Sequence, residues 1–386
     1  MKNNKLIASI FIVSIAFAFF SCQPAGSKQS KLLHDNPAFV FVKDMGIGVN
    51  IGNTLDAINN HVSDTPAGET GWGNPLITKE FVQALKNHGY KTIRLPVTWA
   101  EFLGPAPDFT IDPERMNRAE EVVRWILDED LYCILNLHHD GGTSPKSWIL
   151  NAGNDPEGIN KQLAAVWTQI ADCFRDCSDK LILEAMNEVG FDNLWNRWNP
   201  ATSGTKSEAF RILNMLNQTF VDTVRGTGSN NANRFLLVSG YWTDFQNTAD
   251  PLFKMPNDTA ENKLLLSLHY YTPATFCILD EDASWGKNRR EWGSSEDYDE
   301  LKNLFAILRK PFTDKGIPII LGEYGVNMRN KDEPSRVRWM TAVTQTSLDN
   351  NMCPILWDTG GEIKRNAPYE ITDSLREVLE ALRFGE

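Results

Sequence analysis

The chain is poor in cysteine and in positive charge. It has six cysteines in 386 residues, no CxxC pair of the kind that binds zinc, and a formal net charge of −12. A nucleic-acid-binding protein needs a basic surface over the phosphates, so the acidic balance argues against that class. A chain of this length can bury a large core, so the fold is not expected to need disulfides. We expect buried thiols at Cys173 and Cys177, although their spacing also permits a bridge.

Only one long hydrophobic run is present, and it lies at the N-terminus. Leu6–Phe20 is apolar except for two serines, follows two lysines and precedes Ser21 and Cys22. The run is short for a membrane span, so residues 1–21 are predicted to be an export signal that is cleaved. Cys22 is similar to the lipidated cysteine of bacterial lipoproteins. The bulky residues before it also permit simple secretion, and an uncleaved anchor helix is the third interpretation.

A short polar stretch separates this signal from the rest of the chain. Residues 22–37 are rich in small and polar residues and are predicted to be a flexible tether, followed by one folded domain over 38–386. The protein is therefore expected to be exported and membrane-anchored, at the cell surface or on the periplasmic face. Its only contact with the membrane would be the N-terminal lipid; otherwise it would be secreted.

Aromatic residues are abundant. The chain has 12 Trp and 20 Phe and is 42% hydrophobic, which excludes disorder as the main state. We expect most of the tryptophans to fill a core. A few are expected to be exposed platforms for flat ligands such as sugar rings, whose C–H faces stack on aromatic rings.

Short apolar runs alternate with longer amphipathic stretches along the whole domain. Because the runs show little alternation, they are typical of parallel strands buried on both faces. Eight such units predict a single (β/α)8 TIM barrel, an α/β fold. An open doubly wound sheet is the alternative, but no GxGxxG follows the first strand. The predicted strands are Gly46–Gly52, Thr92–Pro96, Tyr132–Leu137, Leu181–Met186, Arg234–Ser239, Leu264–His269, Ile317–Gly322 and Met352–Trp357. The predicted helices are Thr78–His88, Asp112–Glu129, Ile159–Cys177, Lys206–Arg225, Ser295–Lys315, Pro334–Asn350 and Thr372–Phe384, with no strong helical period over Thr243–Asn262.

Polar residues gather at the ends of these strands, where active sites of such barrels lie. Glu188 follows the fourth strand and Glu323 ends the seventh, on opposing sides of the barrel. Two carboxyl groups across a pocket suit glycoside hydrolysis, in which one must be protonated and the other ionised. Arg94, inside the second strand, could belong to a core salt bridge or could hold a carboxylate ionised.

Two adjacent histidines follow the third strand. Neighbouring residues of a strand point to opposite faces, so His138 and His139 are not expected to bind one metal together. We expect them to form hydrogen bonds in a polar pocket, and we expect neither a metal nor a cofactor.

Taken together, the motifs resemble those of glycoside hydrolase family 5, and within it the endoglucanases and xyloglucanases. The resemblance covers about residues 38 to 384. It is carried by Gly52-Asn53-Thr54-Leu55-Asp56, Gly71-Trp72-Gly73-Asn74-Pro75, Ile93-Arg94-Leu95-Pro96-Val97-Thr98-Trp99, Asn136-Leu137-His138-His139, Asn187-Glu188, His269-Tyr270-Tyr271-Thr272-Pro273 and Gly322-Glu323-Tyr324-Gly325.

This resemblance implies a retaining endo-β-1,4-glucanase that works by double displacement. Glu323 matches the nucleophile and Glu188 the acid/base. The resemblance implies that Arg94 and Tyr271 form hydrogen bonds to the nucleophile and that Asn187 binds the 2-hydroxyl of the sugar. It also implies that His138 and His269 lie in the pocket beside the reacting sugar and that Trp357 lies under this sugar as a stacking platform. Less specific matches, which could equally shape the cleft walls, are Asn53, Trp72 and His139.

Two loops depart from the family pattern. Val189-Gly190-Phe191 follows the acid/base where many members have proline, and Asp358-Thr359-Gly360-Gly361 follows Trp357. These loops are expected to alter contacts with the substrate and not the chemistry. Because the barrel is expected to take up nearly all of this length, we expect no carbohydrate-binding module within it.

Three alternatives stay open. The first is a mannanase or xylanase of the same fold, because the subsite residues cannot be placed. The second is a non-catalytic glycan-binding lipoprotein, against which the two glutamates and Arg94 argue. The third is a metal-dependent hydrolase. The expected partner is a β-glucan polysaccharide or oligosaccharide, and we expect a monomer.

Overall fold

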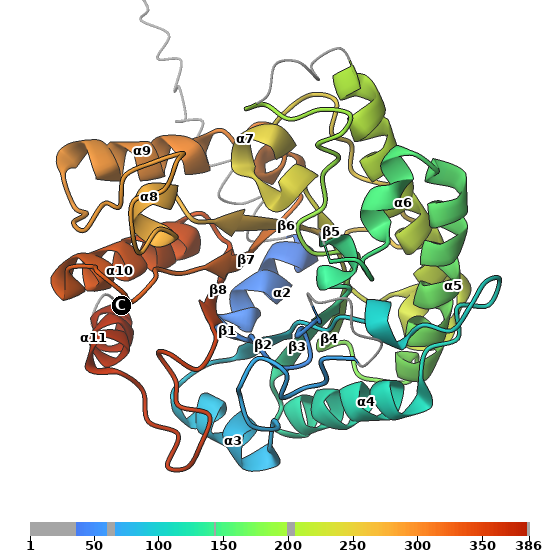
Figure 1. The fold of residues 1–386 in the computed structure, drawn as a ribbon, viewed down its shortest axis with the longest axis horizontal. Coiled ribbons are helices and arrows are strands. Elements are labelled where there is room, and N and C mark those ends of the chain that lie inside the picture. Colours follow the sequence, from blue (N-terminus) through green and yellow to red (C-terminus); the bar gives the residue numbers. More distant parts are fainter. Residues whose placement is uncertain (1–35, 60–65, 143, 199–204, 384–386) are drawn as a thin grey trace, which may run out of the picture.

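The computed structural model describes residues 36–59, 66–142, 144–198 and 205–383, so the predicted export signal, Cys22 and nearly all of the predicted tether lie outside the described residues. Eight parallel strands close into a barrel, in which β1 pairs with both β2 and β8. Figure 1 shows the strands at the centre and the helices around them. The predicted (β/α)8 barrel is therefore confirmed. The strands are β1 (Gly48–Ile51), β2 (Thr92–Leu95), β3 (Tyr132–Asn136), β4 (Leu181–Glu184), β5 (Leu236–Ser239), β6 (Leu264–Tyr270), β7 (Ile319–Tyr324) and β8 (Cys353–Asp358).

Most of the outer helices follow the predicted ranges to within three residues, and several begin at side-chain caps. The prediction of one helix over Ser295–Lys315 is too long, because that helix ends at Ala306. Thr78 accepts a hydrogen bond from Phe81 N at the start of α3, and Asp112 caps α4, with proline at the first helical position. The stretch Thr243–Asn262, which shows no strong helical period in the sequence, contains a single turn of α-helix, α7. The α-helices are α2 (Pro37–Met45), α3 (Lys79–Asn87), α4 (Pro113–Asp128), α5 (Pro156–Phe174), α6 (Lys206–Gly226), α7 (Phe245–Thr248), α8 (Ala274–Cys277), α9 (Ser295–Ala306), α10 (Glu333–Asp349) and α11 (Asp373–Arg383).

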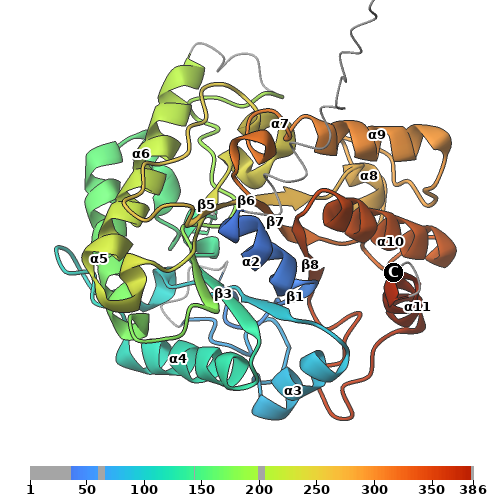
Figure 2. The same cartoon turned by 180° about the vertical axis from the view of Figure 1, so that it is seen from behind.

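The sequence analysis did not predict α2, which begins inside the stretch assigned to the tether. Asn36 caps it and Pro37 is its first residue. Its apolar face, formed by Ala38, Val42 and Met45, packs on side chains of the barrel interior such as Ile134, Ile182 and Ile355. Figure 2 shows α2 lying across this end of the barrel. Because α2 closes the N-terminal end, the strands open to solvent at their C-terminal ends.

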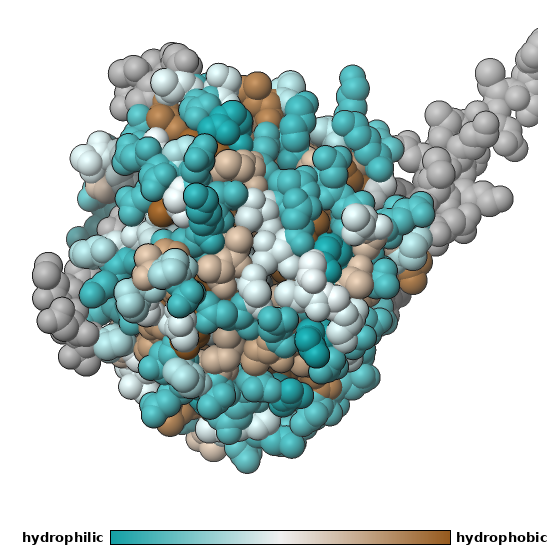
Figure 3. Space-filling model, turned by 90° about the vertical axis from the view of Figure 1, so that its right-hand side faces the viewer, coloured by the Kyte–Doolittle hydropathy of each residue, from teal (hydrophilic) through white to brown (hydrophobic). Residues whose placement is uncertain are grey.

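A second core lies between the barrel and the outer helices. Six tryptophans are buried, four are half-buried and two, Trp198 and Trp285, are exposed, so half of the tryptophans and not most of them are buried in the core. The face in Figure 3 is largely hydrophilic, with small hydrophobic areas between the hydrophilic ones.

All five cysteines in the described residues are free, including Cys173 and Cys177. Within the same residues no helix is long and apolar enough to cross a membrane.

Candidate active site

Arg94 lies at the centre of the open end of the barrel and is fully buried. Its Nε donates to Glu184 Oε2 and its Nη1 donates to Glu323 Oε1, each at 2.7 Å. Arg94 therefore forms the core ion pair of the first interpretation and also contacts the carboxylate at the end of β7, as the second interpretation requires. Its charge is shared between two acidic groups.

Two asparagines complete the surroundings of Arg94. Nη1 also donates to Asn50 Oδ1 at 3.0 Å, and Nη2 donates to Asn187 Oδ1 at 2.8 Å. The Asn50 amide in turn donates to the carbonyl of Gly322 at 2.9 Å, which fixes the strand just before Glu323. Sequence reasoning missed Asn50 and Glu184; the available signal was a polar residue inside an apolar strand, the same signal that identified Arg94.

The two predicted catalytic glutamates meet at one histidine. His269 Nδ1 lies 2.7 Å from Glu188 Oε1 and 3.6 Å from Glu323 Oε2. One carboxylate oxygen of each glutamate and one ring nitrogen of His269 all lie within 4.8 Å of one another. The Glu323 side chain is 7% exposed and the Glu188 side chain 40% exposed, so Glu188 is the one that a ligand can reach more freely.

The pKa shifts of this pair in the free site run opposite to the expectation that Glu188 is protonated and Glu323 ionised. Burial raises the pKa of Glu323 even though His269 and Arg94 oppose it. The negative charge of Glu188 adds to the effect of burial. Burial also acts on Glu188, but the interaction with His269 prevails and lowers the pKa of Glu188. The two groups are close enough to titrate as a pair, so ionisation of one disfavours ionisation of the other.

Tyr271 supports Glu323 from the other side. Its hydroxyl donates to Glu323 Oε2 at 2.9 Å. Burial and the nearby charge of Glu323 raise the pKa of Tyr271 well above its usual range. The phenol therefore stays protonated at working pH and remains a hydrogen-bond donor to the carboxylate.

The aromatic wall of the site is formed by side chains after β1 and β3 and by one on β8. The ring of Trp357 lies parallel to that of His138, with an interplanar angle of 4° and centroids 5.5 Å apart. Trp72 lies against His139 at 5.4 Å. Burial lowers the pKa of both histidines, that of His139 to about 4, so both rings are neutral at pH 7.

The expectation that His138 and His139 point apart is wrong. β3 ends at Asn136, so neither histidine is in a strand and the alternation rule does not apply. The rings meet edge to face with centroids 4.5 Å apart. Together with Asp56 they form a group of three whose ligand atoms lie within 4.8 Å of one another, which is one of two places among the described residues where a cation could be held. The other is the group of Glu188, His269 and Glu323.

Asn53 belongs to a turn that is built around Asp56. Asn53 has φ of 57°, and its N–H donates to Asp56 Oδ2 at 3.0 Å. The N–H of Thr54 donates to the other oxygen at 2.6 Å, and burial raises the pKa of Asp56 to about 6. The motif around Asn53 therefore shapes the wall after β1.

The loop after Glu188 is held by the loop after β5. The N–H of Trp242 donates to the carbonyl of Val189 at 2.9 Å. Trp242 has φ of 55°, an uncommon conformation for a bulky residue. A Cβ added at Gly190 would lie 2.2 Å from Trp242 Nε1, so only glycine fits there. The glycine at position 190 is thus explained by the Trp242 indole that packs on it.

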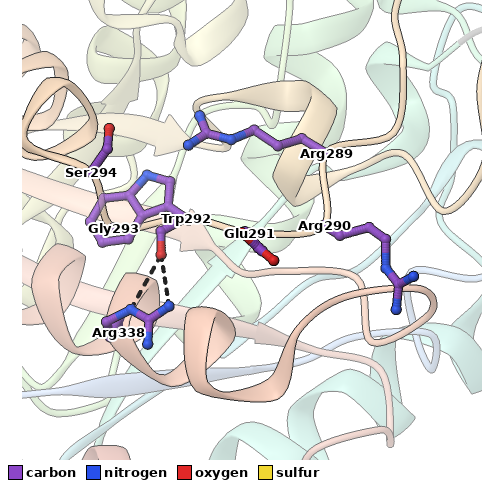
Figure 4. A pocket seen from close by; sticks show the side chains of 7 residues that line it. All are labelled: Arg289, Arg290, Glu291, Trp292, Gly293, Ser294 and Arg338. Atoms are coloured by element: carbon purple, nitrogen blue, oxygen red, sulfur yellow. Dashed lines mark hydrogen bonds between the residues drawn. The ribbon is translucent and has the colours of Figure 1, made fainter.

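A separate cavity lies where α9 begins. It has a volume of about 550 Å³ and is lined by Arg289, Arg290, Trp292 and Arg338 among others. Figure 4 shows Arg338 donating two hydrogen bonds to the carbonyl of Trp292. None of the residues around Glu188 and Glu323 lines it, so the pair of glutamates and not this cavity is the candidate active site.

The chain is similar to known enzymes along most of its length. Residues 55–362 match the family model described as cellulase (glycosyl hydrolase family 5). Endoglucanase A of Paenibacillus barcinonensis is 35% identical over 376 residues, which cover 92% of this chain and 89% of that protein.

Solved structures give the same result. A broad-specificity endoglucanase from an uncultured bovine rumen ciliate superposes with a TM-score of 0.79 at 34% identity, covering 90% of this chain and 98% of that one. A family 5 xyloglucanase from Paenibacillus pabuli, in complex with ligand, has a TM-score of 0.77 at 32% identity, covering 89% and 99% of the two chains.

Proposed function

The chain belongs to glycosyl hydrolase family 5, and we propose that it cleaves the β-1,4-linked backbone of a β-glucan with retention of the anomeric configuration. It is an endo-β-1,4-glucanase that acts on β-glucans. The preferred glucan and the role of each site residue belong to the proposal. Cellulose-type chains, mixed-linkage glucan and xyloglucan are the candidate substrates.

The observation that carries the retaining mechanism is the short distance between the two glutamates. An oxygen of Glu188 lies within 4.8 Å of an oxygen of Glu323. Retaining enzymes place the two carboxyl groups about 5–5.5 Å apart, whereas inverting enzymes need about 6.5–9.5 Å to admit a water molecule. The gap in this barrel therefore favours direct attack by a carboxylate.

In the first step Glu323 attacks the anomeric carbon and Glu188 protonates the departing oxygen. Arg94 and Tyr271 each donate a hydrogen bond to Glu323, which aims the attacking oxygen and stabilises its charge. In the second step Glu188, now ionised, takes a proton from water, and the water releases the sugar from Glu323. His269 contacts Glu188 and orients its carboxyl group in both steps.

The first step requires the carboxyl group of Glu188 to be protonated. In the free site His269 lowers the pKa of Glu188. A sugar bound beside Glu188 would cover a side chain that is now 40% exposed, and desolvation raises the pKa of a carboxyl group. Substrate binding would thus move the proton to the group that must donate it.

The sugar in the cleft is proposed to stack on Trp357, which His138 backs, and Asn187 is proposed to bind the 2-hydroxyl. Asn187 is suited to this because Arg94 fixes its amide oxygen and leaves its NH₂ group free of that contact. Trp72, His139 and Asn53 are proposed to form the cleft wall beyond. No cofactor or metal is required by these steps.

A reducing-end assay tests the proposed function. The wild-type enzyme should release new reducing ends from at least one of carboxymethyl cellulose, mixed-linkage glucan and xyloglucan, with long products early. Mannan and xylan should be cleaved much more slowly. Glu188→Gln and Glu323→Gln are the matched controls, and release of ends by both variants at the wild-type rate would contradict the proposal.

We further propose that the enzyme is an exported, monomeric lipoprotein with Cys22 as its lipidated residue. The basic and apolar N-terminal segment supports this. Cys22→Ala should move the protein from the membrane fraction to the soluble fraction of the producing cells and abolish labelling by a palmitate analogue. Unchanged labelling would contradict the assignment.

A further inference from the structure

The side chain of Asn74 joins the loops after β1 and β8. Its Nδ2 atom donates to the carbonyl oxygen of Asn53, after β1, and to that of Thr359, after β8, each at 3.0 Å. The carbonyl oxygen of Gly52 lies 3.4 Å from the same nitrogen. Asn74 belongs to the Gly71–Pro75 motif, but the proposed steps of hydrolysis give its side chain no task.

The loop after β8 is shaped around the Asn74 side chain. Gly360 has φ of 95°, a conformation that favours glycine. A Cβ added at Gly360 would lie 2.7 Å from Asn74 Oδ1, so a larger residue would displace the amide. The buried carboxylate of Asp358 accepts hydrogen bonds from the N–H groups of Gly360 at 3.2 Å and Glu362 at 2.9 Å. Asn74 therefore binds a loop whose own hydrogen bonds already order it.

Trp357 depends on the same stretches of backbone. A Cβ added at Gly52 would lie 3.0 Å from Cζ2 of the indole, so the ring packs directly on the backbone after β1. The N–H of Gly52 donates to the carbonyl of Asp358 at 2.9 Å. The hydrogen bonds of Asn74 lie one residue beyond Gly52 and one residue beyond Asp358, so they hold the backbone on both sides of the indole.

Asn74 also closes an arc of four aromatic rings. Trp72 lies against His139 at 5.4 Å, His139 meets His138 at 4.5 Å, and His138 lies parallel to Trp357 at 5.5 Å, each distance joining ring centroids. Trp72 and Trp357 are the two ends of this arc. Asn74 comes two residues after Trp72 and binds the loop that follows Trp357, so it ties the two ends together.

We infer that Asn74 is a positioning residue that sets the spacing of Trp72 and Trp357 around the part of the glucan chain that is attacked. The inference rests on the proposed function. Each hydrogen bond of the amide contributes little by itself, but without them the two loops can separate and the rings lose their fit to the sugar. Because the rings contact the sugar before and during the reaction alike, the loss should appear in KM and not in kcat.

Kinetics on nitrophenyl β-cellobioside test this role, because only a nitrophenol leaves and both sugars lie on the attacked side. Asn74→Ala should raise KM about tenfold, which corresponds to ~1.4 kcal/mol, and should keep kcat within about twofold. Asn74→Asp keeps the size of the side chain and lacks the N–H donors, so it should raise KM equally at about pH 7. At about pH 4 the new carboxyl group is partly protonated and regains a donor, so its KM should approach that of the wild type at the same pH.

Asn230→Ala is the matched control. The Nδ2 atom of Asn230 also donates to a backbone carbonyl at 3.0 Å, that of Cys177, but Asn230 lies just before β5, at the opposite end of the barrel. This variant should leave KM unchanged.

A wild-type KM in both Asn74 variants, with normal glucan hydrolysis, would overturn this inference alone. A fall in kcat at unchanged KM would also overturn it, since it would show only a smaller amount of folded enzyme. Asn74→Asp decides the question if Asn74→Ala does not fold. A wild-type enzyme that cleaves no β-glucan would overturn the proposed function and the inference with it.

Discussion

The Nε atom of Arg94 lies 2.7 Å from Oε2 of Glu184, and both side chains are fully buried. Glu184 is also bound by the hydroxyl of Ser267, which donates to its other oxygen at 2.6 Å. Arg94 reaches Glu323 only with its second nitrogen. Glu184 thus controls how much of the Arg94 charge acts on the proposed nucleophile, although it contacts neither reacting oxygen.

Glu184→Gln should shift the pH optimum of kcat/KM to lower pH. Without the Glu184 charge, Arg94 acts fully on Glu323, and a stronger positive neighbour lowers the apparent pKa values of the glutamate pair. The free energy of unfolding should fall by about 3 kcal/mol, because a buried ion pair is broken. A pH–rate profile and a urea titration measure the two effects.

Glu120→Gln is the control for this variant. Glu120 pairs with Arg124 on the surface of α4, so its loss should cost only about 0.5 kcal/mol. An optimum of Glu184→Gln that stays in place or moves to higher pH would show that Glu184 does not restrain Arg94.

Substrate binding should change the pH profile of the wild-type enzyme. The kcat/KM profile reports the free enzyme and the kcat profile reports the complex. Because a bound sugar would desolvate the exposed part of Glu188, the upper apparent pKa of the pair should rise, and the alkaline limb of kcat should lie at higher pH than that of kcat/KM. Coincident alkaline limbs would argue against this movement of the proton.

Tyr271→Phe should lower kcat/KM about 10- to 100-fold, the effect of removing one hydrogen bond to a charged group, worth about 1.5–3 kcal/mol. The lost bond is the one from the Tyr271 hydroxyl to Glu323. Tyr324→Phe is the matched control on the neighbouring strand, since its hydroxyl contacts Thr344 of α10 instead. That variant should lose stability and keep its activity once folded. Equal effects of both variants on kcat/KM would contradict the assigned role of Tyr271.

Gly190→Ala should lower both activity and stability, because the added methyl group would meet the indole of Trp242. The loop that carries Glu188 would have to move, so kcat/KM should fall at least about tenfold, the factor for ~1.4 kcal/mol of misplacement.

The control for Gly190→Ala is Gly226→Ala. The position at the end of α6 has open space around an added Cβ, and this change should be neutral or stabilising by up to about 1 kcal/mol. Full activity of Gly190→Ala would show that the contact with Trp242 does not hold the loop.

The barrel was predictable because each strand is a short apolar run between amphipathic helices, and every strand end was placed within two residues. The α2 helix was missed for a local reason: its alternating Phe39, Val40, Phe41 and Val42 are typical of a strand, although Asn36 and Pro37 are a helix start signal. Tertiary packing against the barrel interior decides its conformation.

The site was predictable where a residue type alone implies its task, as with the two glutamates and a buried arginine. It was not predictable where the task depends on partners. Glu184 has its role only because Arg94 lies beside it, and His138 meets His139 only because β3 ends before them.

The central claim is that Glu323 forms the bond to the sugar, and rescue by azide tests it most directly. Glu323→Gly should cleave nitrophenyl β-cellobioside at a rate at least about 10³-fold below wild type, since the nucleophile is lost. Azide can enter the space left by the side chain and attack the sugar directly, which yields the α-glycosyl azide. In Glu188→Gly, azide would instead attack the sugar bound to Glu323, which yields the β-glycosyl azide.

The anomeric configuration of the azide product, measured by NMR, therefore separates the two roles. The account predicts the α-azide from Glu323→Gly and the β-azide from Glu188→Gly. The reverse pattern, or wild-type activity in Glu323→Gly without azide, would contradict it.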